Sequence, residues 1–231
     1  MLCCQSTVAL KGSEVPVTKF NGKNGLDVVC LTVSMFATNC YLVFCTETRE
    51  AVVIDPGANG KGIIEKVKSY GLSIKYIINT HAHVDHIGAN GKIKETFKVP
   101  ILLGEKDLQI YEKPAFGLSL FFKKQPKPDR LISEGTRISF GRVYLDVLET
   151  PGHSPGSISL LSEDAVFCGD TLFAGSIGRT DLPGGSHEQL IKSIHEKLLV
   201  LQDHVAIYPG HGPVTTPGNE IYANPFIDVS G

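Results

Sequence analysis

The sequence has no excess of basic residues: 22 Lys and Arg against 24 Asp and Glu leave a formal charge of −2. A surface that follows phosphate groups is therefore not expected, which argues against a nucleic-acid partner. The chain also lacks a run of ~20 apolar residues, so no membrane-spanning helix is expected. Its first residues lack the basic and apolar regions of a secretory signal. We expect a flexible tail over residues 1–20 and one folded domain over 21–231.

None of the six cysteines forms a Cys-x-x-Cys pair. Cys3 and Cys4 are adjacent, and we interpret them as part of the tail rather than as lipidation sites. The other four lie in apolar, strand-like runs, which favours reduced core thiols and a cytoplasmic protein over a disulfide framework. Cys168 precedes Asp170 by two residues and either packs in the core or faces a site.

What the sequence does contain is a normal globular composition, with 42% apolar and 20% charged residues. Apolar patterning predicts strands over 27–33, 41–44, 51–54, 74–78, 100–103, 143–149, 157–161, 165–168 and 204–208. Helical spacing predicts helices over 59–70, 88–97, 105–113 and 186–201, the last with Ser186 near its N-cap. Runs of strands with interspersed helices indicate an α/β (α+β) domain of mixed sheets covered by helices.

Four candidate metal ligands fall within six residues, in the segment His81-Ala82-His83-Val84-Asp85-His86. Two histidines at i and i+2 share one side of extended backbone. A helical zinc motif would place them at i and i+4 instead. Asp85 and His86 follow where the chain turns into the next helix. This short segment can therefore present two pairs of ligands at one place.

Three further candidates follow predicted strands at Gly-containing turns: Gly152-His153, Gly169-Asp170 and Gly210-His211. Ligands placed just after strands converge at one edge of a sheet, where α/β proteins commonly bind small molecules. The remaining histidines, His187, His195 and His204, are interpreted as surface or half-buried residues.

Imidazole and carboxylate are the usual zinc donors, and seven of them exceed what one tetrahedral ion needs. The set suits two divalent ions with a bridging carboxylate. We assign His81, His83 and His153 to one ion and Asp85, His86 and His211 to the other, with Asp170 bridging. Zinc is the first expectation, and the donors also accept iron or manganese. Hydroxide generated at the metals would attack a carbonyl carbon, with Asp85, His86 and Asp170 at the reacting centre.

Three other features have more than one interpretation each. Asp55, in Asp55-Pro56-Gly57, either hydrogen-bonds a ligand histidine or is a plain turn residue. Arg179 either binds a substrate carboxylate or pairs with Asp181. In the loop over residues 114–129, the apolar segment Ala115–Phe122 either walls a substrate pocket, forms a dimer patch or packs over the core.

The ordered set from His81 to His211, with Asp55-Pro56-Gly57 before it, resembles the metallo-β-lactamase superfamily. The resemblance implies a four-layer αββα sandwich of two mixed β-sheets, with the metals at one edge and a single catalytic domain. Asp170 at the bridging position resembles the glyoxalase II branch. Gly178-Arg179-Thr180-Asp181 and Asn224-Pro225-Phe226 look like its short members, which implies thioester substrates such as hydroxyacylglutathione.

The same scaffold leaves alternatives open. An iron-dependent persulfide dioxygenase uses part of the donor set for one ion, and its family also has a Gly-Arg-Thr-Asp segment. A lactone or other ester hydrolase, a metal-bearing scaffold without catalysis and, most distantly, a nuclease are the others. Whether glutathione is the thiol part of the substrate stays open. Glyoxalase II has a C-terminal domain whose basic residues help to hold glutathione, and only 20 residues follow His211 in this sequence. The expected partner is a small-molecule substrate, with a homo-oligomer also considered.

Overall fold

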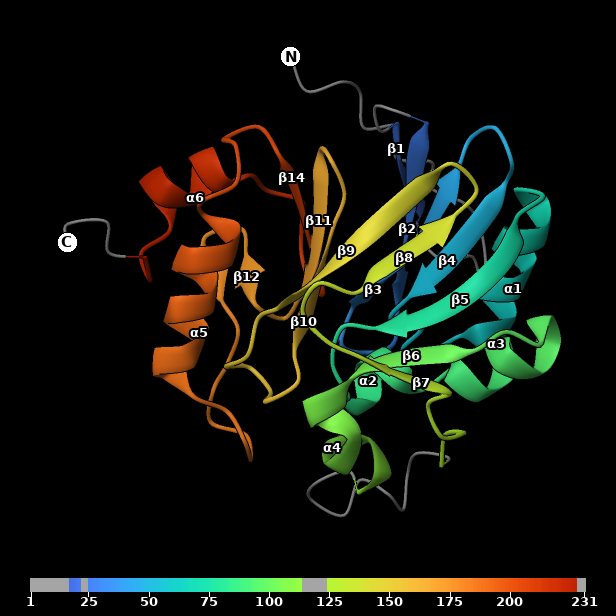
Figure 1. The fold of residues 1–231 in the computed structure, drawn as a ribbon, viewed down its shortest axis with the longest axis horizontal. Helices are drawn as coiled ribbons and strands as arrows, with labels where there is room; N and C mark the ends of the chain where they lie inside the picture. Colours follow the sequence, from blue (N-terminus) through green and yellow to red (C-terminus); the bar gives the residue numbers. More distant parts are fainter. Residues whose placement is uncertain (1–16, 22–24, 114–123, 228–231) are drawn as a thin grey trace.

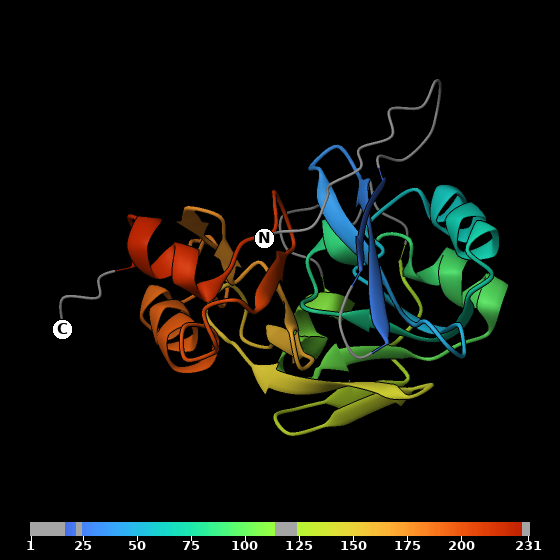
Figure 2. The ribbon, with the colours of Figure 1, turned by 90° about the horizontal axis from the view of Figure 1, so that it is seen from above.

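The computed structural model describes residues 17–21, 25–113 and 124–227. Two β-sheets lie face to face in the middle of the molecule, and helices cover the outer face of each (Figures 1 and 2). The expected αββα arrangement is therefore present. The helices outside the first sheet are α1 (Gly60–Ser69) and α3 (Asn90–Phe97). Those outside the second are α5 (His187–Ser193) and α6 (Pro217–Ala223).

The first sheet has seven strands in chain order, antiparallel from β1 to β4 and parallel from β4 to β7. The strands are β1 (Val17–Asn21), β2 (Leu26–Val33), β3 (Thr38–Cys45), β4 (Glu50–Ile54), β5 (Ser73–Asn79), β6 (Ile101–Gly104) and β7 (Arg130–Ile132). Because β4, β5 and β6 are parallel, the loops after them open at the same edge.

The second sheet has the order β14-β11-β10-β9-β8, and only the β11–β14 pair is parallel. Its strands are β8 (Arg137–Phe140), β9 (Val143–Glu149), β10 (Ile158–Leu161), β11 (Ala165–Gly169) and β14 (Ala206–Pro209). A small hairpin of β12 (Leu172–Phe173) and β13 (Ser176–Ile177) follows β11. Both large sheets are therefore mixed, as expected.

The core explains why strands β3 and β4 have continuous apolar sequences. Tyr41 and Val43 pack between the two sheets, whereas Leu42 and Phe44 pack beneath α1 and α3. Successive side chains of a strand point to opposite faces, so a strand buried on both faces needs apolar residues throughout. A third apolar cluster lies between the second sheet and α5. Three apolar layers thus separate the four layers of secondary structure.

Two of the predicted helices need correction, and a third is confirmed. The helix predicted over 88–97 is α3, which begins at Asn90, and the separate short helix α2 (Val84–Ile87) precedes it. The one predicted over 105–113 begins as the 3₁₀ turn η1 (Glu105–Asp107) and continues as α4 (Leu108–Glu112). The one over 186–201 is α5, with the Ser186 cap as predicted, followed by the π-helical turn η3 (Ile194–Leu198).

Seven elements were not predicted: the strands β1, β7, β8, β12 and β13, and the helices α2 and α6. Strand β1 pairs with β2 along its whole length, so the sheet starts inside the range predicted as a tail. Residues 1–16 lie outside the described residues, and so does the apolar segment 115–122. Their predicted roles remain predictions.

The four cysteines among the described residues are free thiols. Cys168 is buried in the cluster beneath α5, where its Sγ contacts the Leu172 carbonyl oxygen at 3.3 Å, and burial raises its pKa to about 12. The core interpretation of this residue is therefore correct. None of the described helices is long and apolar enough to cross a membrane.

Candidate metal centre

All seven candidate ligands meet at one edge of the two sheets, although they come from four separate segments. His81 and His83 lie in the loop after β5, and Asp85 and His86 lie in α2. The other three follow strands of the second sheet: His153 follows β9, Asp170 follows β11 and His211 follows β14. The convergence expected from the positions of these residues after strands is therefore present.

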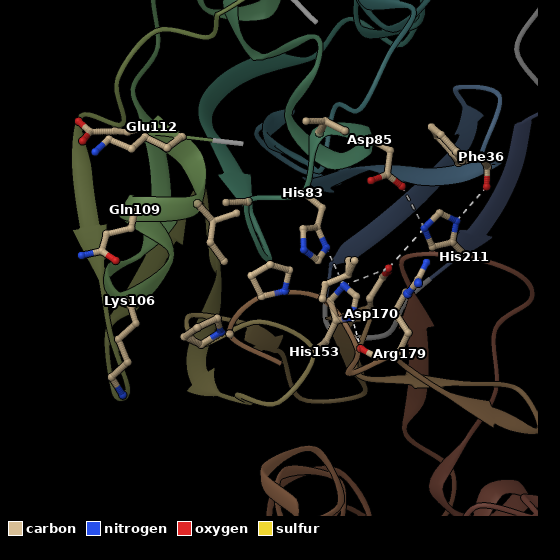
Figure 3. Close-up of a pocket in the computed structure, with 18 of the residues that line it drawn as sticks. Phe36, His83, Asp85, Lys106, Gln109, Glu112, His153, Asp170, Arg179 and His211 are labelled. Atoms are coloured by element: carbon tan, nitrogen blue, oxygen red, sulfur yellow. Dashed lines mark hydrogen bonds and ion pairs between the residues drawn. The ribbon is translucent and has the colours of Figure 1, made fainter. Parts of the chain in front are cut away.

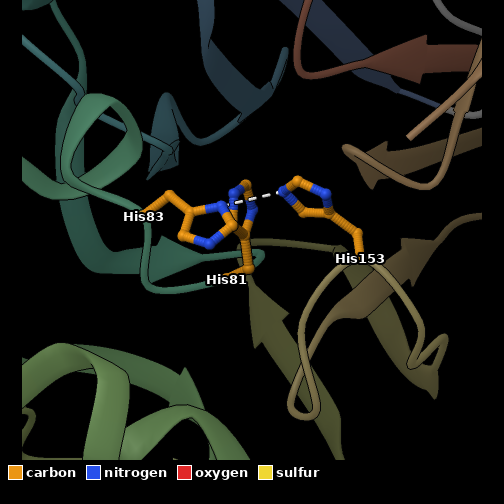
Figure 4. Close-up of side chains that lie close together, drawn as sticks. All are labelled: His81, His83 and His153. Carbon is orange, nitrogen blue, oxygen red and sulfur yellow. Dashed lines mark hydrogen bonds between the residues drawn. The ribbon is translucent and has the colours of Figure 1, made fainter. Parts of the chain in front are cut away.

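One group consists of three histidines, His81, His83 and His153 (Figure 4). Each offers a ring nitrogen, and these atoms all lie within 4.8 Å of one another. The ring centroids are 4.6 to 4.7 Å apart, and the rings are nearly perpendicular. His83 Nδ1 and His153 Nε2 approach to 2.8 Å. Three imidazoles aimed at one point are a suitable set of ligands for a divalent ion.

A second group consists of Asp85, His86 and His211, again with donor atoms within 4.8 Å of one another. The Nε2 atoms of His86 and His211 are 3.3 Å apart. Asp85 Oδ2 lies 3.6 Å from His86 Nε2 and 3.3 Å from His211 Nε2. This group therefore differs from the first by containing a carboxylate.

Asp170 lies between the two groups. Its Oδ1 is 3.4 Å from His86 Nε2, in the second group. Its Oδ2 is 3.6 Å from His153 Nε2 in the first group and 3.5 Å from His211 Nε2 in the second. One carboxylate thus faces donors of both groups, which is the placement that a bridging ligand requires.

The other ring nitrogen, Nδ1, of three histidines is held by a neighbouring oxygen. His86 Nδ1 donates to Asp55 Oδ2 at 2.9 Å. His153 Nδ1 donates to the Arg179 carbonyl at 2.8 Å, and His211 Nδ1 donates to the Phe36 carbonyl at 3.0 Å. A bond of this kind fixes the ring orientation and leaves the Nε2 lone pair free for a metal.

Asp55 has the ligand-orienting position that was one of its two interpretations. The carboxylate is buried, and besides contacting His86 it accepts from Thr80 N at 2.8 Å and from Thr80 Oγ1 at 2.6 Å. Thr80 Oγ1 in turn lies 3.1 Å from His81 Nδ1. A single carboxylate therefore connects to a ring in each of the two groups.

The anchoring bonds create a test of whether a cation fits. With both Nδ1–H groups engaged, the Nε2 atoms of neutral His86 and His211 are acceptors, and they face each other and two carboxylates. Such a set is repulsive unless positive charge lies among the atoms. His81 Nε2 and Asp170 Oδ1 are also buried without a hydrogen-bond partner among the described residues, which is costly for polar atoms. The residues present fit divalent metal ions.

The pKa values describe the same charge requirement. Burial lowers the pKa of His83 to about 4, and burial also lowers that of His81. Burial alone would lower the pKa of His86 and His211 too. The carboxylates of Asp170, Asp55 and Asp85 instead raise the pKa of His86 to about 9. Burial thus favours neutral His81 and His83, whereas the carboxylates around His86 favour positive charge among the donors of the second group.

Gly210, just before His211, is required for space. A Cβ at this position would lie 2.0 Å from Asp170 Oδ1 and 2.8 Å from His86 Cε1. The glycine therefore lets the backbone after β14 pass directly beside the donor atoms.

Five of the seven donors line a cavity of about 1170 Å³ (Figure 3): His83, Asp85, His153, Asp170 and His211. One wall comes from η1 and α4 and includes Lys106, Gln109 and Ile110. Another part of the wall is largely apolar and includes Phe36, Phe173, Ile177, Leu182 and Pro183. No Ser or Cys is among the described residues that line the cavity. The cavity is large enough for a small molecule of cofactor size.

Arg179 lines this cavity, but its guanidinium forms a two-bond ion pair with Asp181, with both distances 2.7 Å. Both side chains are exposed. The internal-pair interpretation of Arg179 is therefore correct, and a role toward substrate stays a proposal. His187 and His204 are exposed and His195 is half-buried, as predicted.

Sequence reasoning missed several residues that hold the ligands. Thr38 Oγ1 donates to Asp85 Oδ2 at 3.2 Å, and Asn39 Nδ2 donates to the carbonyl of Pro209 at 3.1 Å, just before the His211 loop. These residues begin β3, an apolar strand whose first two polar residues were the available signal. The backbone carbonyls of Phe36 and Arg179 could not be predicted from the sequence as partners of ligand histidines, because every residue has a carbonyl.

Comparison with known proteins gives a match over most of the chain. The model of a family described as the metallo-beta-lactamase superfamily matches residues 34–211. A Bacillus subtilis protein named probable metallo-hydrolase YqgX is 38% identical over 204 residues, covering 86% of this chain and 96% of the relative. The Haemophilus influenzae hydroxyacylglutathione hydrolase GloC is 37% identical over 215 residues, covering 88% and 99%.

Solved structures agree with these relatives. The BLEG-1 B3 metallo-beta-lactamase superposes with a TM-score of 0.80 at 39% identity, covering 87% of this chain and 99% of that one. A di-iron-bound form of TTHA1623 gives 0.78 at 37% identity, covering 86% and 99%. ETHE1 from Myxococcus xanthus gives 0.72 at 30% identity, covering 86% and 83%.

Proposed function

The chain belongs to the metallo-beta-lactamase superfamily, and from this premise we propose that it is a dinuclear zinc hydrolase that cleaves thioesters. The observation that carries the proposal is the position of Asp170. Its two carboxylate oxygens face donors of both groups at 3.4 to 3.6 Å, at one end of a large cavity. We therefore assign His81, His83 and His153 to one ion, Asp85, His86 and His211 to the other, and Asp170 to both.

Two divalent ions bound in this arrangement supply Lewis acidity toward a carbonyl oxygen and lower the pKa of water toward ~7. In hydrolysis the water oxygen forms a bond to the acyl carbon, the carbon–sulfur bond breaks, and a carboxylate and a thiol leave. Asp85, which reaches the cavity from the first turn of α2, is placed to accept a proton from the attacking water. His86, held by Asp55, keeps its Nε2 directed at the reacting centre.

The thioester class is supported by the relative named hydroxyacylglutathione hydrolase, of which the match covers 99%. The described lining of the cavity has no Ser or Cys for a covalent acyl intermediate, which fits direct attack by water. The apolar wall over Phe173, Ile177 and Leu182 is suited to the carbon chain of an acyl or thiol group.

The test is an assay of the zinc-loaded protein against four substrates: a hydroxyacylglutathione, an acyl thioester of a small thiol without carboxylates, a lactone and a β-lactam. We expect turnover of the thioesters above the other two, complete loss with a chelator, and recovery when zinc is added back. The His83→Ala variant should be folded but inactive, whereas the matched His187→Ala variant, which changes an exposed histidine outside the site, should be unaffected. Faster turnover of the lactone or β-lactam would refute the thioester proposal.

An iron-dependent persulfide dioxygenase is the second candidate. It is favoured by the compact group of His81, His83 and His153, which can hold a lone ion. The di-iron form of a similar structure also supports iron as a metal for these donors. Elemental analysis decides between the two: one iron per chain together with oxygen consumption would replace the hydrolase proposal.

A further inference from the structure

Asp107, the last residue of the 3₁₀ turn η1, is a buried carboxylate that the proposed chemistry does not use. No Lys, Arg or His of the described chain forms an ion pair with it. An ionised carboxylate with no countercharge is costly to bury unless several donors satisfy it. The groups that donate hydrogen bonds to the Asp107 carboxylate therefore indicate its role.

Those donors come from two separate ligand loops. Asp107 Oδ2 accepts from Ala82 N at 2.8 Å, and Ala82 is the residue between His81 and His83. The same oxygen accepts from Ser154 Oγ at 2.8 Å, next to His153. Asp107 Oδ1 accepts from Gly156 N at 2.6 Å in the same loop. One carboxylate thus ties together the two segments that carry the three-histidine group.

The backbone is arranged to bring Asp107 this close. A Cβ on Gly156 would lie 2.3 Å from Asp107 N and 2.9 Å from Asp107 Cβ. A Cβ on Gly104, at the end of β6, would lie 2.1 Å from the Gly156 carbonyl oxygen. Two glycines therefore let the β6–η1 turn lie directly against the His153 loop, which no larger residue permits.

We propose that Asp107 is a positioning residue: it fixes the His81–His83 loop against the His153 loop and so sets the affinity of the three-histidine group for its ion. Asp107 forms no hydrogen bond with a residue of the second group. In that group, His86 is held by Asp55 and Asp85 is held by Thr38. The effect of Asp107 is thus confined to one of the two metal positions. This inference rests on the proposed function only in requiring that the wild-type protein binds metal.

The test compares Asp107→Asn with Asp129→Asn by metal titration. Both oxygens of Asp107 accept a backbone N–H, so either orientation of an Asn amide places an NH₂ group against a donor. Asp129 also accepts a backbone N–H, from Ile101 at 2.8 Å at the start of β6, but it contacts neither ligand loop. Asp129 is more exposed than Asp107 and also pairs with Lys94, and it serves as the control for losing a carboxylate that holds the start of β6.

The readouts are zinc affinity in competition with a chromogenic chelator, zinc stoichiometry, and the visible spectrum of the cobalt-substituted protein. For Asp107→Asn we expect ~10-fold weaker binding of one of two ions and a changed cobalt spectrum, as for other residues behind metal ligands. For Asp129→Asn we expect two ions with wild-type affinity and an unchanged spectrum. Ser154→Ala, which removes one of the three bonds, should give a smaller loss and serves if Asp107→Asn does not fold.

Wild-type affinity and an unchanged cobalt spectrum in Asp107→Asn, or in Ser154→Ala if that is the variant that folds, would overturn the positioning role. An equal loss in Asp129→Asn would also overturn it, since stability alone would then explain the effect. If the wild-type protein binds no metal, the proposed function fails first, and this inference fails with it. An unchanged variant of a metal-binding wild type refutes only the role of Asp107.

Discussion

The two groups of donors differ in burial, charge and support. In the three-histidine group, His81 and His153 are 1% and 3% exposed, His83 is half-buried, and all three donors are imidazoles; in the second group His86 is fully buried. In the second group, the side chains of His211 and Asp85 are 27% and 18% exposed, and carboxylates balance the charge. Each group presents two of its donors to the cavity, His83 and His153 from the first and Asp85 and His211 from the second, so the side that meets a substrate differs mainly in charge.

The largest expected effect comes from removing what the groups share. Asp170→Ala should reduce hydrolysis by ~10³-fold or more, because several kcal/mol of transition-state stabilisation depend on the metals. The variant should bind fewer than two ions and remain folded. Zinc analysis, turnover and circular dichroism of the purified variant check this. Near-normal turnover would show that the carboxylate does not join the two groups.

Asp55→Asn should weaken metal binding by the second group more than by the first. Asp55 has a φ of 49°, a left-handed backbone that Asn also tolerates, so the backbone is kept. With the Asn oxygen toward Thr80 N, its NH₂ group replaces the oxygen that accepts from His86 Nδ1 and Thr80 Oγ1. We expect the second group to bind its ion ~10–100-fold more weakly while the first keeps most of its affinity. Stepwise zinc titration measures this. Equal weakening of both ions would indicate that Asp55 acts on His81, through Thr80, as much as on His86.

Thr38→Val tests a weaker support of the second group. The change keeps the shape of this buried side chain and removes its hydrogen bond to Asp85 Oδ2. One hydrogen bond contributes ~0.5–1.5 kcal/mol, so the ion of the second group should bind a few-fold more weakly. Asp55→Asn in the same titration sets the scale. A loss as large as that of Asp55→Asn would contradict the ranking of the two supports.

The smallest effect is expected at the cavity wall. Arg179→Gln removes an exposed ion pair with Asp181 and leaves the carbonyl that His153 contacts. Metal content should stay at the wild-type level, and KM for thioesters should rise by no more than ~3-fold, since exposed pairs contribute little. A much larger rise in KM for substrates with a carboxylate, but not for neutral ones, would establish Arg179 as a substrate ligand.

The parts of the fold that the sequence predicted are those with strong periodicity. The apolar runs of β3 and β4 are strands buried on both faces, and Asn59 and Ser186 begin helices as N-caps. The parts it did not predict have weak local signals. Helix α2 starts after His83, which makes no side-chain cap, and β12 and β13 have two residues each. Tertiary contacts decide such elements.

The candidate site followed the same rule. Its ligand residues could be named because His and Asp after strands are chemically distinctive. The supports of those ligands could not, apart from Asp55. Asp107 sits in Glu105-Lys106-Asp107, which has the composition of an exposed turn, yet its carboxylate is buried. Its partners are 25 to 49 residues distant in sequence, and only the fold brings them together.

The most direct measurement is a crystal structure of the zinc-loaded protein with anomalous scattering recorded on both sides of the zinc edge. We expect two zinc peaks ~3.5–4 Å apart, one among His81, His83 and His153 and the other among Asp85, His86 and His211. Asp170 should contact both. A single peak with Asp170 turned away, or no peak at this edge of the sheets, would contradict the two-metal account.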